Sequence, residues 1–231
     1  MKTIGMLGGM SWESTALYYR IANELVRERE GGLASADLLV RSIDFAQVRQ
    51  LQVQDRWQEA ADLLLREARV LQAGGAELVL ICTNYMHKVA PTVEAGLRVP
   101  LLHIADSAAA AALAAGAVRV GLTGVAATMT EPFYAERLAR HGLQVLVPDA
   151  PDRELLDRAI FDELCLGVLS DATRTALRGA LARLVAAGAQ AVVLGCTELE
   201  LLLRPDDCEV PLLPSARLHV EAALALAFAR S

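Results

Sequence analysis

Two similar stretches, each a run of aliphatic residues that ends in Cys-Thr, lie about half a chain apart. Residues 78–84 read LVLICTN and residues 192–198 read VVLGCTE. Each follows a glycine-bearing segment and stops where a helix could begin, which is the pattern of a buried strand. Ligands collect at the carboxyl ends of such strands, because backbone N–H groups and helix dipoles point outward there. The pattern predicts two thiols, Cys82 and Cys196, at ligand-binding positions.

Two further landmarks repeat in the same order. Residues 4–9 (IGMLGG) resemble residues 120–125 (VGLTGV), and the tetrapeptide VPLL occurs at both 99–102 and 210–213. Three landmarks at nearly constant offsets indicate a chain built from two similar halves. If the halves face each other about a pseudo-twofold axis, Cys82 and Cys196 approach one substrate from opposite sides. That is the geometry of a racemase.

Composition limits the class of protein. The 231 residues are 54% hydrophobic, only 4% are aromatic, and the net charge is −6 without a basic cluster, so nucleic acid and anionic membranes are poor partners. The longest apolar run, residues 108–118, is too short to cross a bilayer. We therefore expect a soluble, cytoplasmic protein. The four cysteines and four histidines show no metal-ligand spacing, so we expect no metal, and a disulfide between Cys82 and Cys196 is disfavoured in a reducing compartment.

Strands alternate with helices along the chain, which predicts an α/β fold with mostly parallel sheets flanked by helices on both faces. We expect an N-terminal lobe of residues 1–103 plus about 214–231, a C-terminal lobe of residues 104–213, and an active site in the cleft between them. Thr130 is the expected N-cap of a helix that begins near Pro132. Besides the two cysteine strands, the expected strands are 3–7, 37–42, 99–103, 119–123, 144–147 and 210–213, and the expected helices are 14–30, 57–73, 86–96, one after residue 105, 132–140, 152–166, 171–187 and 216–230.

The paired cysteines suggest a reaction. Either cysteine taken alone is more often a small buried hydrophobe. Two at equivalent points of a duplicated pattern indicate chemistry, because racemising an α-amino acid needs a base on one face of the Cα–H bond and an acid on the other. A helix N-terminus lowers a thiol pKa, so we expect one thiolate and one thiol, with roles that exchange with the direction of reaction. No cofactor is then required.

Polar residues beside the cysteines are candidate substrate contacts. Thr83, Asn84 and Thr197 can donate hydrogen bonds to the α-carboxylate of a substrate. Alternatively, they are N-cap residues of the helices that follow, because N-capping needs the same residue types. Glu198 is expected to hold the ammonium group or to bias Cys196 toward its thiol form; alternatively it is a helix first-turn acid.

Three candidates lie elsewhere in the sequence. Gln52 belongs to a glutamine-rich segment, residues 43–56, which is either a solvated helix face or a lid. Met10 lies in the loop after the first expected strand, and Thr128 lies in the corresponding loop of the second half. His87 is expected to point away from the site, and the other histidines to be packing or surface residues.

Nearly the whole chain resembles the cofactor-independent aspartate/glutamate racemases of the Asp/Glu/hydantoin racemase superfamily, and in particular their broad-specificity bacterial branch. The resemblance lies in residues 1–15, in CTNYMHK at 82–88 and in GCTE at 195–198. It implies two pseudo-symmetric α/β lobes, catalytic cysteines at Cys82 and Cys196, an amino-acid substrate, no pyridoxal phosphate and a homodimer.

Several positions depart from this resemblance. The aspartate racemases are expected to carry a tyrosine and a lysine where this chain has Phe161 and Cys165. A Gly-Thr pair is replaced by Gly124-Val125, and an Asp-Thr pair by Pro214-Ser215. We therefore expect specificity that is broad or shifted from aspartate. Two other functions stay open: a single-cysteine lyase or decarboxylase (or another isomerase) of the same superfamily, and a non-catalytic amino-acid-binding protein.

Overall fold

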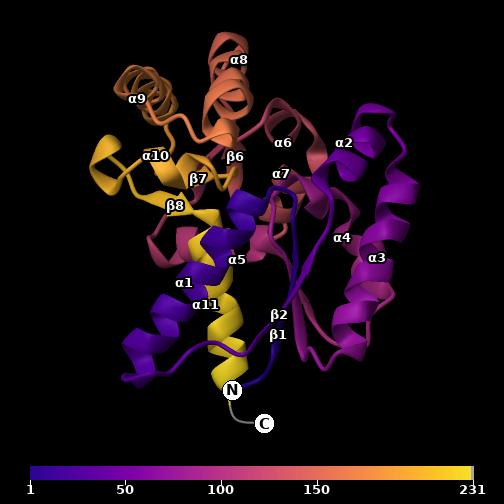
Figure 1. Cartoon of the computed structure of the whole chain (residues 1–231). Coiled ribbons are helices and arrows are strands. Elements are labelled where there is room, and N and C mark those ends of the chain that lie inside the picture. The colour runs from indigo at the N-terminus through magenta and orange to yellow at the C-terminus, as the bar shows by residue number, and fades with distance from the viewer. Residues whose placement is uncertain (230–231) are drawn as a thin grey trace. The chain divides into compact units, whose positions relative to one another are not determined.

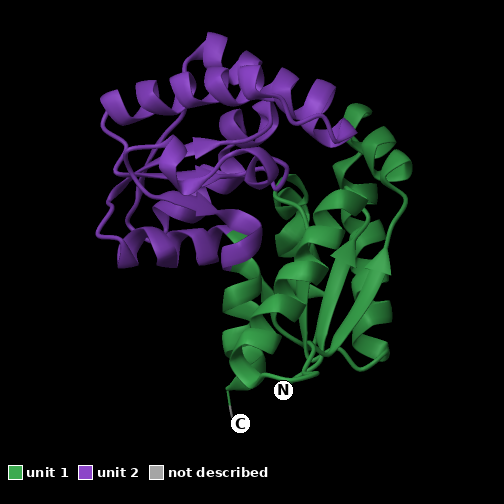
Figure 2. Ribbon diagram, turned by 60° about the vertical axis from the view of Figure 1, so that its left-hand side comes forward, with its two compact units in different colours: residues 1–104, 219–231 green, residues 105–218 purple. Residues whose placement is uncertain are grey.

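A computed structural model of the chain describes residues 1–229. They divide into two compact units (Figure 2). Unit 1 comprises Met1–Ile104 and the segment that begins at His219, and unit 2 comprises Ala105–Leu218. Each unit contains a four-stranded parallel sheet flanked by helices. The predicted α/β fold with parallel sheets in two similar halves is confirmed.

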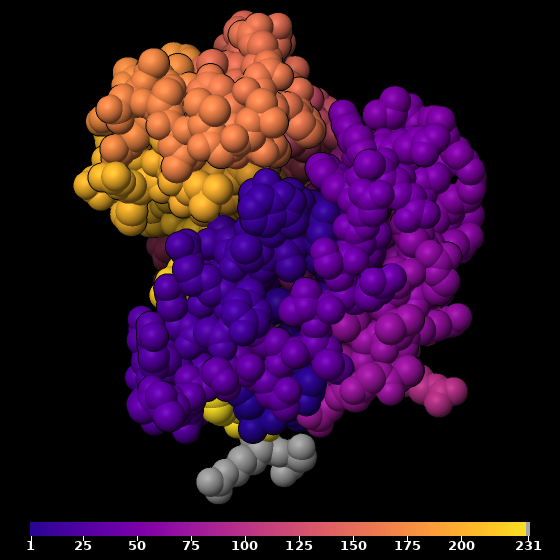
Figure 3. Space-filling model, viewed as in Figure 1, coloured from indigo at the N-terminus to yellow at the C-terminus, as the bar shows by residue number. Residues whose placement is uncertain are grey.

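Unit 1 has the strand order β2-β1-β3-β4. Every residue of the central strands β1 and β3 is buried, as expected for strands covered on both faces. Helix α1 forms part of the outer surface of this unit (indigo in Figure 3). The elements (Figure 1) are β1 (Ile4–Gly8), α1 (Trp12–Glu30), β2 (Leu38–Ser42), α2 (Phe45–Val53), α3 (Trp57–Ala73), β3 (Leu78–Ile81), the 3-10 helix η1 (Tyr85–Val89), α4 (Ala90–Ala95) and β4 (Leu101–Leu102).

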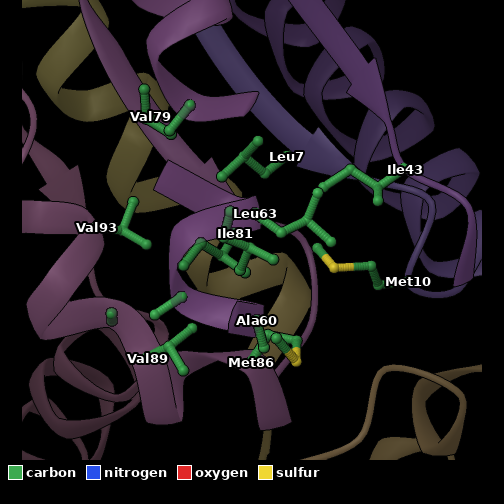
Figure 4. Close-up of a cluster of buried hydrophobic side chains, with 14 of the residues drawn as sticks. Leu7, Met10, Ile43, Ala60, Leu63, Val79, Ile81, Met86, Val89 and Val93 are labelled. Atoms are coloured by element: carbon green, nitrogen blue, oxygen red, sulfur yellow. The ribbon is translucent and has the colours of Figure 1, made fainter. Parts of the chain in front are cut away.

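One hydrophobic cluster of unit 1 includes side chains of its sheet and of α3. Leu7, Val79 and Ile81 from the strands meet Leu63 from the helix, and Figure 4 shows these side chains together. At the rim, the buried Glu67 of α3 accepts hydrogen bonds from Arg41 (2.6 Å) and Arg66 (3.0 Å). Burial alone would raise the pKa of Glu67, but the two guanidinium groups hold it below its ordinary value. This ionised carboxylate therefore fastens β2 to α3.

Unit 2 repeats the same topology, with strand order β6-β5-β7-β8. Strand β5 takes the place of β1, and β7 takes the place of β3. Its elements are α5 (Ile104–Ala114), β5 (Arg119–Thr123), α6 (Ala126–Thr130), α7 (Pro132–Ala139), β6 (Gln144–Leu146), α8 (Ala150–Arg158), the π-helical segment η2 (Ala159–Glu163), the 3-10 helix η3 (Leu164–Leu166), α9 (Asp171–Ala186), β7 (Ala191–Leu194), α10 (Leu199–Leu202), the 3-10 helix η4 (Pro205–Asp207) and β8 (Leu212–Pro214).

Two predictions for unit 2 are wrong. Thr130 is not an N-cap: it ends α6, its hydroxyl donates to the Ala126 carbonyl, and Glu131 occupies the N-cap position of α7. The helix expected over residues 152–166 is broken into α8, η2 and η3. Gly167, in the left-handed conformation with φ of 75°, ends this run.

The last helix, α11 (Ser215–Phe228), has its first residues in unit 2 and the remainder in unit 1. In unit 1, the Lys2 N–H donates to the Ala227 carbonyl (2.8 Å), and the Arg29 guanidinium lies 3.9 Å from the centroid of the Phe228 ring. These contacts hold α11 against the start of the chain and α1. Residue 230, the expected end of this helix, lies outside the described residues. Over residues 1–229, no helix combines the length and apolar character needed to cross a membrane.

Candidate active site

The glycine loop after β1 brings α1 up to the first cysteine. A Cβ on Gly8 would lie 2.4 Å from Cγ2 of Thr15, so only glycine allows this close approach. Gly9 has φ of 87°, and its N–H donates to the Thr15 hydroxyl (2.8 Å). Ser11 caps α1 by accepting from the Ser14 N–H (3.2 Å). As a result the first turn of α1 is fixed to the end of the sheet.

Cys82 directly follows the central strand β3. Its N–H donates to the Leu7 carbonyl (2.9 Å), and its carbonyl accepts from the Ser14 hydroxyl (2.8 Å). The side chain is fully buried, and burial raises the pKa of the thiol well above its ordinary value. Its surroundings therefore favour the neutral thiol over the thiolate.

The residues after Cys82 form a loop that leads into η1. Asn84 is buried and occupies the N-cap position, yet its side chain makes no capping bond, so plain N-capping does not explain it. Thr83 is half-buried, and its carbonyl accepts from Nδ1 of His87 (2.8 Å). His87 was expected to point away, but it is buried against this loop. Sequence spacing indicated that His87 was near the cysteine and gave no sign of this bond.

Met10 and Gln52 have different environments. Met10 is 3% exposed and belongs to the hydrophobic cluster of unit 1 (Figure 4), which accounts for its side chain as a packing residue. Gln52 lies on α2, half-buried; its Nε2 lies 3.0 Å from the Met86 sulfur, and its Oε1 accepts from Arg49 (3.3 Å). The exposed Arg49 thus places a positive charge next to Gln52, a candidate substrate contact. Nothing in the sequence around Arg49 indicated this.

Cys196 occupies the equivalent place in unit 2, after β7. Its thiol is buried and donates to Oε2 of Glu198 (3.0 Å), which also accepts from the Thr197 hydroxyl (2.8 Å). Burial raises the pKa of the Cys196 thiol, and the neighbouring carboxylate raises it further. The structure bears on one of the roles expected for Glu198: its carboxylate accepts a hydrogen bond from the Cys196 thiol and adds to the rise in the pKa of that thiol.

The expectation that helix N-termini lower the thiol pKa values is wrong for both cysteines. The next helical segments begin only at Tyr85 and Leu199, three residues after each cysteine. Burial dominates instead and raises both pKa values. Both shifts therefore favour the thiol form, where one thiolate and one thiol were expected.

Thr128 packs beside the loop that carries Cys196. A Cβ on Gly195 would lie 3.3 Å from Cγ2 of Thr128 and 2.5 Å from the Thr123 carbonyl oxygen. Thr128 is fully buried, and within residues 1–229 its hydroxyl has no hydrogen-bond partner. A buried orphan hydroxyl is costly unless a ligand or water satisfies it. Thr128 thus remains a candidate substrate contact.

Two of the residues that depart from the resemblance, Phe161 and Cys165, lie on the broken helical run of unit 2. Phe161 is half-buried on η2, and Cys165 is half-buried on η3. Cys165 packs against the hydrophobic cluster that contains Cys196. None of the four cysteines forms a disulfide, and residues 1–229 hold no group of three or more His, Cys, Asp or Glu side chains arranged for a metal ion.

These observations define a class of protein: a duplicated α/β chain in which each half has a thiol-bearing loop after its third strand. The model of the Asp/Glu/hydantoin racemase family matches residues 7–223. A protein from Yersinia pestis described as a candidate Asp/Glu racemase is 44% identical, with a TM-score of 0.93 over 99% of this chain and 100% of that one. An aspartate racemase homologue from Pyrococcus horikoshii is 34% identical, with a TM-score of 0.88 over 98% and 99%. The chain belongs to the Asp/Glu/hydantoin racemase family.

A more distant protein shares the fold alone. Arylmalonate decarboxylase is 14% identical, with a TM-score of 0.53 over 100% of this chain and 95% of the other. Because one fold can host several reactions, the reaction has to be argued from the residues of the site.

Proposed function

We propose that this protein is a pyridoxal-phosphate-independent amino-acid racemase in which Cys82 and Cys196 act on opposite faces of the substrate Cα. The supporting observation is that the two halves repeat one strand order and each has a cysteine within two residues of the end of its third strand. A single-cysteine lyase needs only one of these thiols. A binding protein needs neither.

The two thiols differ in a way that suits an acid and a base. Glu198 accepts a hydrogen bond from Cys196 and keeps that thiol protonated, so Cys196 begins as the acid. Cys82 is neutral because it is buried, so an incoming positive charge favours its ionisation. We propose that the substrate ammonium group supplies that charge, so that Cys82 releases its thiol proton to solvent as the substrate binds and the resulting thiolate takes the α-proton as the base. In the reverse direction the roles exchange.

The substrate carboxylate needs hydrogen-bond donors whose effect grows as negative charge develops at Cα. Thr83, Asn84, Thr128 and Thr197 are the proposed donors, and Gln52 is a proposed contact of the substrate side chain. The Thr128 hydroxyl supports this assignment, because it is buried without a partner within residues 1–229.

The direct test uses purified protein with single enantiomers of the amino acids and no added pyridoxal phosphate. Chiral chromatography should show the opposite enantiomer accumulating to an equal mixture. Binding without turnover would support the non-catalytic alternative. Release of carbon dioxide from a disubstituted malonate, without interconversion of amino-acid enantiomers, would support the decarboxylase.

A further inference from the structure

Two buried side chains, Ser14 of α1 and His87 of η1, hold the two peptide groups that follow Cys82. The Ser14 hydroxyl donates to the Cys82 carbonyl (2.8 Å), and Nδ1 of His87 donates to the Thr83 carbonyl (2.8 Å). Ser14 is 3% exposed and His87 is 1% exposed. Water cannot readily compete for these bonds, so they fix the loop firmly.

The hydrogen bonds of His87 define its tautomer. The Ile104 N–H donates to Nε2 (3.2 Å), so Nε2 carries a lone pair. The Thr83 carbonyl can only accept, so Nδ1 carries the proton. One form satisfies both partners, the neutral imidazole with its proton on Nδ1. His87 therefore bridges the cysteine loop and the start of α5.

The His87 ring is itself held in place by its neighbours. Its centroid lies 4.6 Å from that of His103 and 5.6 Å from that of His219. Nε2 of His219 donates to the Leu102 carbonyl (3.0 Å), and the Tyr18 hydroxyl then donates to Nδ1 of His219 (2.9 Å). Residues of α1, β4 and α11 therefore hold the His87 ring in the position from which it binds the Cys82 loop.

Unit 2 holds the equivalent peptide groups differently. The carbonyls of Cys196 and Thr197 accept from the backbone N–H groups of Leu199 (3.1 Å) and Glu200 (3.2 Å). The second loop is thus fixed by its own backbone, whereas the first relies on two side chains. Side-chain substitutions can consequently release the first loop alone.

We infer that Ser14 and His87 are positioning residues for the carboxylate of the substrate, an inference that rests on the proposed racemase function. A peptide group is planar, with its C=O and N–H pointing in opposite directions. Anchoring the Cys82 carbonyl on Ser14 therefore directs the Thr83 N–H away from Ser14, and anchoring the Thr83 carbonyl on His87 directs the Asn84 N–H away from His87. These two amides, together with the Cys82 thiol, are thereby oriented before the substrate binds.

Four variants test this role. His87→Phe keeps an aromatic ring and removes both hydrogen bonds, and it should lower kcat/KM by about 10- to 100-fold, less than the loss of a direct donor. His87→Asn retains a donor close to the position of Nδ1 and should restore most of that loss. Ser14→Ala should lower kcat/KM in the same way. His103→Phe is the matched control, because it alters the same ring cluster and leaves the bonds from Ser14 and His87 to the loop in place, so it should keep near wild-type kcat/KM.

A second measurement does not require catalysis. The ¹⁵N chemical shifts of the histidine side chains should show His87 with a protonated Nδ1 and an unprotonated Nε2, and adding glutamate should shift the Thr83 amide in the wild type but much less in His87→Phe. If these shifts appear and no amino acid is racemised, the proposed reaction fails and the positioning role stands. A His87 proton on Nε2, or a folded His87→Phe variant with wild-type kcat/KM, would overturn the inference.

Discussion

Gly195, which precedes the second cysteine, occupies a site with no room for a side chain. A Cβ there would lie 2.5 Å from the Thr123 carbonyl oxygen, closer than a carbon can approach without moving the backbone. The Gly195 N–H also donates to that same oxygen (2.8 Å), so β5 and β7 are locked together at this point. The position of Cys196 therefore depends on its neighbour having no side chain.

Gly195→Ala should accordingly destabilise the protein by about 1–3 kcal/mol, the usual cost of overpacking a close contact. Urea unfolding monitored by circular dichroism measures this. Gly179→Ala is the matched control: its Cβ would meet nothing nearer than 3.5 Å within α9, so alanine should stabilise by up to about 1 kcal/mol. Equal stabilities for the two alanine variants would contradict this account of Gly195.

Glu198 raises the pKa of Cys196 beyond the effect of burial. Removing its negative charge should therefore lower that pKa. In Glu198→Gln the thiol loses a neighbouring negative charge, and the pKa of Cys196 should fall. The alkylation rate of Cys196 as a function of pH reports this in a variant whose other three cysteines are serine. If Cys196 is the acid, the alkaline limb of the kcat/KM profile should move to lower pH in Glu198→Gln with both catalytic cysteines intact. An unchanged alkylation profile would show that Glu198 does not influence the thiol.

At the scale of elements, Glu200 joins the cysteine loop of unit 2 to the last helix. Its carboxylate accepts from the Ala216 N–H (2.7 Å) at the start of α11. Burial raises the pKa of Glu200 to about 8, although the N–H groups of Ala216 and Arg217 and the Ser215 hydroxyl act in the opposite direction. The folded protein therefore binds this proton more tightly than the unfolded chain does.

The consequence is a pH dependence of stability. Because folding raises the pKa of Glu200, this carboxyl group stabilises the folded state fully at a pH below about 4.5, the pKa in the unfolded chain. The stabilisation is lost as the pH rises through about 8, the pKa in the folded protein. Tm measured from pH 4.5 to 8 should decline in the wild type, and this component should be absent from Glu200→Gln. Glu209→Gln removes the same formal charge at an exposed position and should leave the slope unchanged. A parallel decline in Glu200→Gln would assign the slope to other groups.

The broken helical run of α8, η2 and η3 should govern the choice of substrate. Cys165 stands where a lysine was expected and packs against the cluster that contains Cys196. Cys165→Lys should therefore raise kcat/KM for aspartate or glutamate relative to alanine by about 10- to 100-fold, the effect of one charge-assisted hydrogen bond. Cys208→Lys places the same charge at another half-buried cysteine of the cluster and should not. A wild type that already prefers aspartate exclusively would indicate that another cation, such as Arg49, binds the side chain.

At the scale of the whole molecule, local sequence pattern predicted most of the architecture and little of the chemistry. Strand β5 was expected at the observed residues, because its alternation and flanking glycines are local signals. The break at η2 and the two high thiol pKa values were missed, because they depend on tertiary packing around residues far apart in sequence. The bond from Ser14 to Cys82 spans 68 residues, and spacing alone could not reveal it. The expected homodimer stays a prediction, which light scattering in solution would test.

The central claim is that the two halves supply one thiol each to a single reaction. Racemisation needs both a base and an acid, so Cys82→Ser and Cys196→Ser should each lower kcat by at least about 10²-fold, the size of a general acid–base contribution. The remaining thiol can still remove the α-proton from the enantiomer presented to it and return a solvent proton to the same face.

Each single variant, incubated in D2O with one enantiomer at a time, tests the claim most directly by mass spectrometry and chiral chromatography. We expect deuterium to enter one enantiomer without inversion, with the two variants favouring opposite enantiomers, while Cys208→Ser racemises like the wild type. If either Cys82→Ser or Cys196→Ser instead racemises at the wild-type rate, that cysteine is structural and the two-thiol mechanism is wrong.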